Sequence, residues 1–188
     1  MKKKLAVAVS GAAVLVLALS SCTSDDADKF TADDWAKKYC DQAQPQLKKK
    51  TDAEQTIRQT AVDSKPAQIQ AADSKAFQDL SDVNKALAAA LRGAGTPPVD
   101  NGEKLVQDAA AELDANSKSY LDLKKQIDAL DAKNQQKFAD GLQPVATGLG
   151  KIEKNEAARK RLNQGDTGEA IAKQPGCKAP VVSSPPAA

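Results

Sequence analysis

The chain of 188 residues contains no histidine. This absence removes the most common general base, the Ser-His and Cys-His nucleophile pairs, and the most common zinc ligand. No alternating run rich in valine, isoleucine or aromatic residues predicts a β-strand. We therefore expect an all-α fold, which excludes an α/β solute-binding protein of the kind that serves ABC transporters.

Other ligand-binding patterns are also missing. The run Gly148-Leu149-Gly150-Lys151 is similar to a phosphate loop, but Val145 stands where such a loop needs glycine, and no strand precedes it. The acidic residues show no calcium-loop spacing, and they lie beside lysines on polar helix faces. The sequence predicts no catalytic residue, no metal ligand and no cofactor.

The most informative segment that is present spans Met1 to Cys22. Three lysines precede an apolar run, Leu5 to Leu19, and the small residues Ser20 and Ser21 stand directly before the cysteine. This order is typical of a removable secretory signal. The alternative is a retained membrane anchor, but fifteen helical residues cover only about 22 Å of a ~30 Å hydrocarbon core. We therefore expect residues 1–21 to be removed.

The four residues Leu19-Ser20-Ser21-Cys22 resemble the lipobox of bacterial lipoproteins. The resemblance implies cleavage between Ser21 and Cys22 and acylation of Cys22 by a diacylglycerol. It also implies a location on the extracytoplasmic face of the cell membrane, where two acyl chains give stable anchoring. The alternative is an ordinary signal peptide followed by a chance cysteine.

The charge balance changes when the signal is removed. Loss of Lys2, Lys3 and Lys4 from the 27 basic residues leaves 24 against 25 acidic ones. A nearly neutral chain gives no reason to expect nucleic acid as a partner.

Two cysteines remain after Cys22. An even pair in an exported protein predicts one disulfide, Cys40 to Cys177, although two free thiols are the alternative. This bond would join the start and the end of the folded region. We expect a polar tether over residues 22–29, a helical domain over residues 30–178, and a disordered proline-rich tail over residues 179–188.

The helical domain should begin at Thr31, whose hydroxyl can cap the first turn. The apolar face of this first helix carries Trp35 and Tyr39. Pro45 should kink or interrupt the helix, and a capping-box pattern predicts a second start near Asp52.

Two long helices follow, from Pro66 to Gly93 and from about Glu103 to Ala132, joined by a short turn. Their apolar residues recur every three or four positions and form one stripe on each helix, as at Ile69, Ala72, Ala76 and Leu80 of the first. The short turn between the two helices predicts an antiparallel hairpin. Asn116 is the polar member of the second stripe, and it either fixes register through a buried hydrogen bond or reaches solvent.

A fourth helical region should run from about Lys133 to Asn163. The glycines and the proline between residues 141 and 150 predict a kink with close helix approach, and the alternative is a hinge beside a small-molecule pocket. A last short helix beginning at Asp166 or Thr167 would bring Cys177 back to Cys40. Together these elements predict an antiparallel bundle of about four helices, clasped by the disulfide.

Two further segments support this view of the chain. The stretch from Asp34 to Cys40 and the late Gly176-Cys177, together with the signal and the acidic tether, resemble small secreted lipoproteins of actinobacteria. The resemblance implies location, helical form and, by analogy, the Cys40 to Cys177 pairing. It implies no assigned activity.

Three functions remain compatible with the sequence. We favour a non-catalytic helical module that binds an envelope or secreted protein partner. The second is a carrier of a small ligand, with a pocket near residues 138–152 that Trp35 or Tyr39 would line. The third is a carboxylate enzyme, which needs two acidic groups converging in a cleft with raised pKa values.

Overall fold

The fold was analysed in a computed structural model, which describes residues 29–60 and 64–178. These residues form six α-helices, one 3₁₀ helix and no strand, so the predicted all-α class is confirmed. The predicted signal (residues 1–21), the cleavage site Ser21/Cys22, nearly all of the tether and the tail (residues 179–188) lie outside the described residues. The elements are α1 (Ala32–Thr60), α2 (Pro66–Ala94), α3 (Gly102–Asp128), α4 (Gln135–Lys154), α5 (Ala157–Leu162), α6 (Gly165–Lys173) and η1 (Pro175–Cys177).

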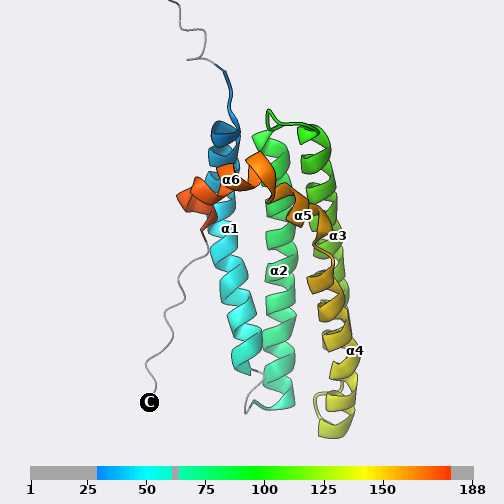
Figure 1. The fold of residues 1–188 in the computed structure, drawn as a ribbon. Coiled ribbons are helices and arrows are strands. Elements are labelled where there is room, and N and C mark those ends of the chain that lie inside the picture. Colours follow the sequence, from blue (N-terminus) through cyan, green and yellow to red (C-terminus); the bar gives the residue numbers. More distant parts are fainter. Residues whose placement is uncertain (1–28, 61–63, 179–188) are drawn as a thin grey trace, which may run out of the picture.

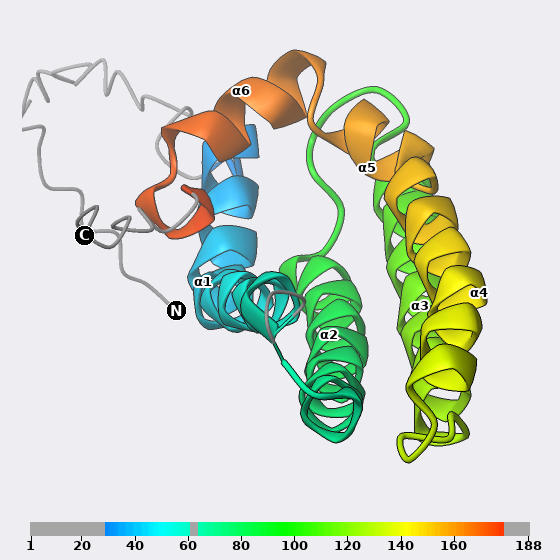
Figure 2. The same cartoon turned by 90° about the horizontal axis from the view of Figure 1, so that it is seen from below.

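The four longest helices run alternately up and down, as predicted for an antiparallel bundle (Figure 1). Each packs on its neighbour in the chain: α1 on α2, α2 on α3, and α3 on α4. Within the described residues no extensive packing joins α1 to α4. The view along the helices therefore shows a curved row, with α1 and α4 near its two ends (Figure 2).

Helix α1 begins with the predicted cap. The backbone N–H of Asp34 donates to the Thr31 hydroxyl oxygen (3.1 Å), and the backbone N–H of Thr31 donates to the Asp34 carboxylate (2.9 Å). This reciprocal pair satisfies two amides of the first turn. Hydrogen bonds from Thr31 also hold the pKa of Asp34 below its ordinary value.

The predicted second start near Asp52 is wrong, and of the kink or interruption predicted at Pro45 the interruption is absent. Helix α1 runs unbroken through Pro45, and the Thr51 hydroxyl donates to the Leu47 carbonyl inside the helix (3.1 Å) instead of capping a new one. Proline removes one backbone donor. Packing of α1 along α2, from Trp35 to Ala53, stabilises the helix on both sides of that lost bond.

Helices α2 and α3 form the predicted hairpin, and its register is set by polar contacts at two levels. The hydroxyls of Ser81 and Ser117 lie 2.9 Å apart in the buried interface. The Gln70 side-chain amide donates to the carbonyls of Ile127 and Leu130, both at 2.9 Å. Gln70 thereby adds a side-chain donor to the carbonyls at the end of α3.

The predicted apolar stripe of α3 is confirmed, since its members up to Ile127 are buried. Asn116 shares this burial, being 1% exposed, and its side-chain oxygen accepts from the Asn155 amide (2.9 Å). Of the two alternatives for Asn116, the structure has the buried hydrogen bond. The buried members of the stripe are Val106, Ala109, Leu113, Asn116, Tyr120, Leu123 and Ile127.

The predicted fourth region is divided into α4 and α5 by a break at Asn155 and Glu156. Two residues of α3 bind the chain on either side of this break. Asn116 holds Asn155, and the Glu112 carboxylate accepts from the backbone N–H of Ala158 (2.7 Å) and from Arg159 Nε (2.7 Å). The break is therefore fixed by α3 rather than by the glycines and Pro144 within α4.

The predicted close approach is nevertheless present along α4. A Cβ atom on Gly148 would lie 2.5 Å from a methyl carbon of Leu123, and one on Gly141 would lie 2.4 Å from a methyl carbon of Leu130. The missing side chains let α4 lie close against α3.

After α4, residues 157–177 form a C-terminal strap that crosses from α3 to α1 (Figure 2). Helix α5 packs on α3, and α6 and η1 pack on α1. The strap ends in the disulfide between Cys177 and Cys40. The backbone at Gly176 lies so close to Cys40 that only a residue without a Cβ fits there. A Cβ atom would lie 2.6 Å from the Cys40 carbonyl oxygen.

The buried apolar residues form two clusters at different levels along the helix axes. The upper cluster lies toward the α2–α3 connection, and the lower cluster lies toward the α3–α4 connection. The upper cluster combines α1, α2 and α3 with the strap residues Ala158, Leu162 and Ala170. The lower cluster combines Phe77 and Tyr120 with Phe138, Val145 and Ile152 of α4. The strap therefore covers the upper cluster, and α4 covers the lower cluster.

Replacing both disulfide cysteines, Cys40→Ser with Cys177→Ser, should loosen the strap while the α2–α3 hairpin remains folded. Loss of a bond across 137 residues should lower the free energy of unfolding by about 3 to 5 kcal/mol. Hydrogen exchange should speed up most in α6 and η1. Equal acceleration in α2 and α3 would contradict the division into hairpin and strap.

Candidate functional site

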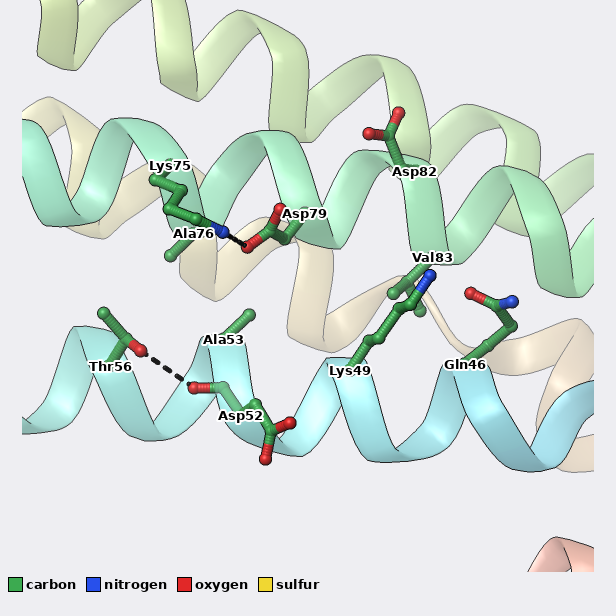
Figure 3. A pocket seen from close by; sticks show the side chains of 10 residues that line it. All are labelled: Gln46, Lys49, Asp52, Ala53, Thr56, Lys75, Ala76, Asp79, Asp82 and Val83. Carbon is green, nitrogen blue, oxygen red and sulfur yellow. Dashed lines mark hydrogen bonds and ion pairs between the residues drawn. The ribbon is translucent and has the colours of Figure 1, made fainter.

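The first candidate site is a groove between α1 and α2, of about 410 Å³. Its floor is apolar and consists of Ala53, Ala76 and Val83. Charged and polar side chains rise from both helices around this floor, and Lys49 reaches from α1 toward Val83 on α2 (Figure 3). The polar lining residues are Gln46, Lys49, Asp52, Thr56, Lys75, Asp79 and Asp82.

The carboxylates of this α1–α2 groove already have partners. Asp79 is bound by Lys75, Asp52 by Lys48 (2.9 Å), and Asp82 accepts from the Gln78 amide (3.2 Å). Each carboxylate is paired with a side chain one turn away on the same helix, as the sequence predicted for acidic residues beside lysines. The groove therefore offers a polar rim and a small apolar floor to a surface partner, and no converging catalytic pair.

A second groove lies between α3 and α4, beside the segment in which the sequence predicted a ligand pocket. One part, of about 350 Å³, is lined by Asn116, Leu123, Gly148 and Ile152 among others, and an adjoining part of about 580 Å³ includes Pro144 and Thr147. The absence of a side chain at Gly148 shapes both parts.

Trp35 and Tyr39 do not line this α3–α4 groove, contrary to the prediction. Trp35 is fully buried in the upper cluster, stacks on Tyr39 with 5.9 Å between ring centroids, and donates from Nε1 to the Gly95 carbonyl (2.9 Å). Burial raises the pKa of Tyr39 to about 12. Both aromatic residues hold α1 in the core.

Asp73 of α2 is the most unusual titratable group among the described residues. Its side chain is 7% exposed, and its Oδ1 atom has no hydrogen-bond partner in the described part of the chain. Burial raises the pKa of Asp73 to about 6, against a smaller opposing effect of a hydrogen bond from Thr60. Water would solvate this carboxylate better than its site does, so the charged form destabilises the fold.

Glu112 of α3 is the other buried carboxylate, and it lies far from Asp73. The Ser81–Ser117 and Gln70–Ile127 contacts place Asp73 level with about residue 125 of α3. That level is roughly 20 Å from Glu112 at ~1.5 Å per residue. Two-carboxylate hydrolysis needs a separation of about 5 to 9.5 Å, so these two groups do not form such a pair.

The sequence-predicted site residues are distributed as follows. Cys40 and Cys177 are bonded to each other, and Ser21 and Cys22 lie outside the described residues. No group of three His, Cys, Asp or Glu side chains among the described residues could hold a metal ion. In the same residues no helix combines the length and the apolar character needed to cross a membrane.

The burial of two residues of α2 was missed from the sequence. Asp73 and Phe77 occupy buried positions of α2, whereas the predicted stripe used Ala72 in that turn, which is only half-buried. Phe77, one helical turn after Asp73, was the available signal, because a large aromatic residue marks the buried face.

Comparison of the chain with protein-family models, with curated proteins and with solved structures found no match.

The variant Asp73→Asn should make the domain more stable at pH 7. Because the folded pKa of about 6 exceeds the ordinary 3.8, the folded state binds the proton more tightly, and the free energy of unfolding falls as the pH rises from about 4 to 6. The loss should be about 3 kcal/mol. Urea unfolding at pH 4 and at pH 7 measures this difference in the free energy of unfolding. Asp73→Asn should remove most of this loss, and the exposed control Asp140→Asn should not.

Proposed function

We propose that this chain is a lipid-anchored, non-catalytic helical module that binds or organises a protein partner at the extracytoplasmic face of the cell membrane. The observation that carries the proposal is the run Leu19-Ser20-Ser21-Cys22, which ends an apolar segment behind three lysines. In this proposal residues 1–21 are removed and acylated Cys22 is the membrane attachment.

The pairing of the cysteines supports the proposed anchor. The bond between Cys40 and Cys177 leaves Cys22 as the only cysteine of the chain outside that disulfide. Disulfides persist in oxidising compartments outside the cytoplasm, which is also where a lipoprotein of this kind is displayed.

A binding role is supported by the distribution of polar groups. The buried carboxylates Asp73 and Glu112 lie at different levels, and Glu112 is engaged by Arg159 and a backbone amide. The exposed helix faces instead carry lysine–aspartate pairs one turn apart, as at Lys37–Asp41 and Lys104–Asp108. Such faces, with the α1–α2 groove between them, suit recognition of another polypeptide.

A second candidate is a carrier of a small ligand in the α3–α4 groove. The position of this groove beside residues 138–152 favours it. Its polar lining would suit a polar ligand more than an apolar one. Because Trp35 is buried in the upper cluster, its fluorescence would not report on this groove.

The variant Cys22→Ala should lose all fatty-acid labelling in cells that export the chain, because the thiol that accepts the diacylglycerol is gone. Metabolic labelling with an alkyne-bearing fatty acid, followed by detection of the purified chain, measures this. Ser21→Ala is the matched control and should remain labelled, since alanine is also small. A labelled Cys22→Ala variant would overturn the proposed anchor.

Crosslinking in intact cells tests binding. A photoreactive amino acid at Lys49, in the α1–α2 groove, should give a discrete protein adduct. The same group at exposed Lys118 of α3, outside both grooves, should give at least fivefold less. Equal and diffuse adducts at both positions would argue against a specific partner. A low-mass adduct at Thr147 without a protein adduct at Lys49 would favour the carrier.

A further inference from the structure

The end of the helices at which α1 begins combines an exposed aromatic residue with a connection that contains an uncharged stretch. Phe30 precedes α1 and is 49% exposed, and it is the only large hydrophobic side chain that is exposed among the described residues. At the same end, the connection between α2 and α3 exposes Gly95, Thr96 and Pro98, and Val99 is half-buried. We call these five residues the N-terminal end face.

The two parts of this face are held together by the fold. Figure 1 shows the start of α1 and the α2–α3 connection at the same end of the helices, the top of the view. The hydrogen bond from Trp35 Nε1 to the Gly95 carbonyl ties the first turns of α1 to this connection. Gly102 brings the connection close to α3, since a Cβ there would lie 2.2 Å from the Pro97 carbonyl oxygen. Phe30, two residues before α1, therefore stands at the same end of the helices as this connection.

The connection at the opposite end of the helices carries more charge. The α3–α4 connection exposes Asp131 and Lys133, and Lys137 follows in the first turn of α4. Residues 93–99 contain no charged side chain, and exposed Asp100, which follows them, is the one charged residue of the α2–α3 connection. Charged groups are costly to bring out of water, so the N-terminal end face can approach the acyl chains of a lipid surface at lower cost.

The length of chain before the domain brings this face to the bilayer. Seven residues separate Cys22 from Phe30, and they span at most ~25 Å when extended. With Cys22 in the membrane, Phe30 is held at a high effective concentration beside the headgroups, so one aromatic side chain and a few small apolar groups suffice for contact.

We propose that the N-terminal end face docks on the lipid surface, with Phe30 in the interface and the helices pointing away from the membrane. This proposal rests on anchoring at Cys22. It places the α1–α2 groove along the side of an upright domain, where it faces the space outside the membrane.

The test couples the chain Cys22–Ala188 through the Cys22 thiol to a maleimide lipid in phosphatidylcholine vesicles. The bonded Cys40 and Cys177 do not react, and the coupling supplies the anchor whether or not cells acylate the chain. Three variants, Phe30→Trp, Thr96→Trp and Ala139→Trp, each add a fluorophore at an exposed position, and buried Trp35 gives a constant background. Brominated phosphatidylcholine is the quencher.

Docking predicts that bromolipid lowers the added emission at least twofold in Phe30→Trp and in Thr96→Trp, and leaves Ala139→Trp at the opposite end unchanged. Adding Phe30→Ser to the Thr96→Trp variant should restore most of that emission. Quenching of Phe30→Trp alone would show mere closeness to the anchor and would overturn the proposal, as would equal quenching of all three. Fatty-acid labelling of Cys22 in cells is measured separately, so a failure of the anchor and a failure of docking are distinguished.

Discussion

The closure of an open row of helices depends on the C-terminal strap. Helices α1 to α4 each pack on their neighbours in sequence, which leaves α1 and α4 without extensive packing on each other. The strap spans this opening at one end, bound to α3 through Glu112 and to α1 through the Cys40–Cys177 bond. A covalent bond at the α1 side matters because strap helices of six and nine residues are too short to be stable alone.

The attachment of the strap to α3 shows how one buried carboxylate, that of Glu112, can fix the course of the chain after α4. Glu112 is 8% exposed, yet both of its carboxylate oxygens accept hydrogen bonds, from the Ala158 amide and from Arg159. With its charge paired and its lone pairs used, burial costs far less than for an isolated carboxylate. Asp73 is the contrasting case, since one of its oxygens is buried without a partner in the described residues. The first carboxylate fixes where α4 ends, while the second only weakens the fold.

Most of the helices and their faces could be predicted from local sequence, and the errors have a common cause. The α2–α3 hairpin and the α1 cap follow from periodicity and from side chains three or four residues apart. The unbroken helix at Pro45 and the break at Asn155 do not, because each depends on a partner helix: α2 supports the first, and Glu112 with Asn116 imposes the second. The α1–α2 groove escaped prediction for the same reason, since its hollow arises where Ala53 and Ala76 face each other from different helices.

Charge is distributed unevenly between the sides and the ends of the domain, and this links the fold to the proposed location. Lysine–aspartate pairs one turn apart cover the sides of the helices, where each pair adds little stability but keeps the surface hydrated. The connection at the end that bears Phe30, residues 95–101, has a single charged side chain, that of Asp100. A tether that starts at this end can bring only this end to a lipid surface without dehydrating the charged sides. The same asymmetry leaves the α1–α2 groove in water, where a protein partner can reach it.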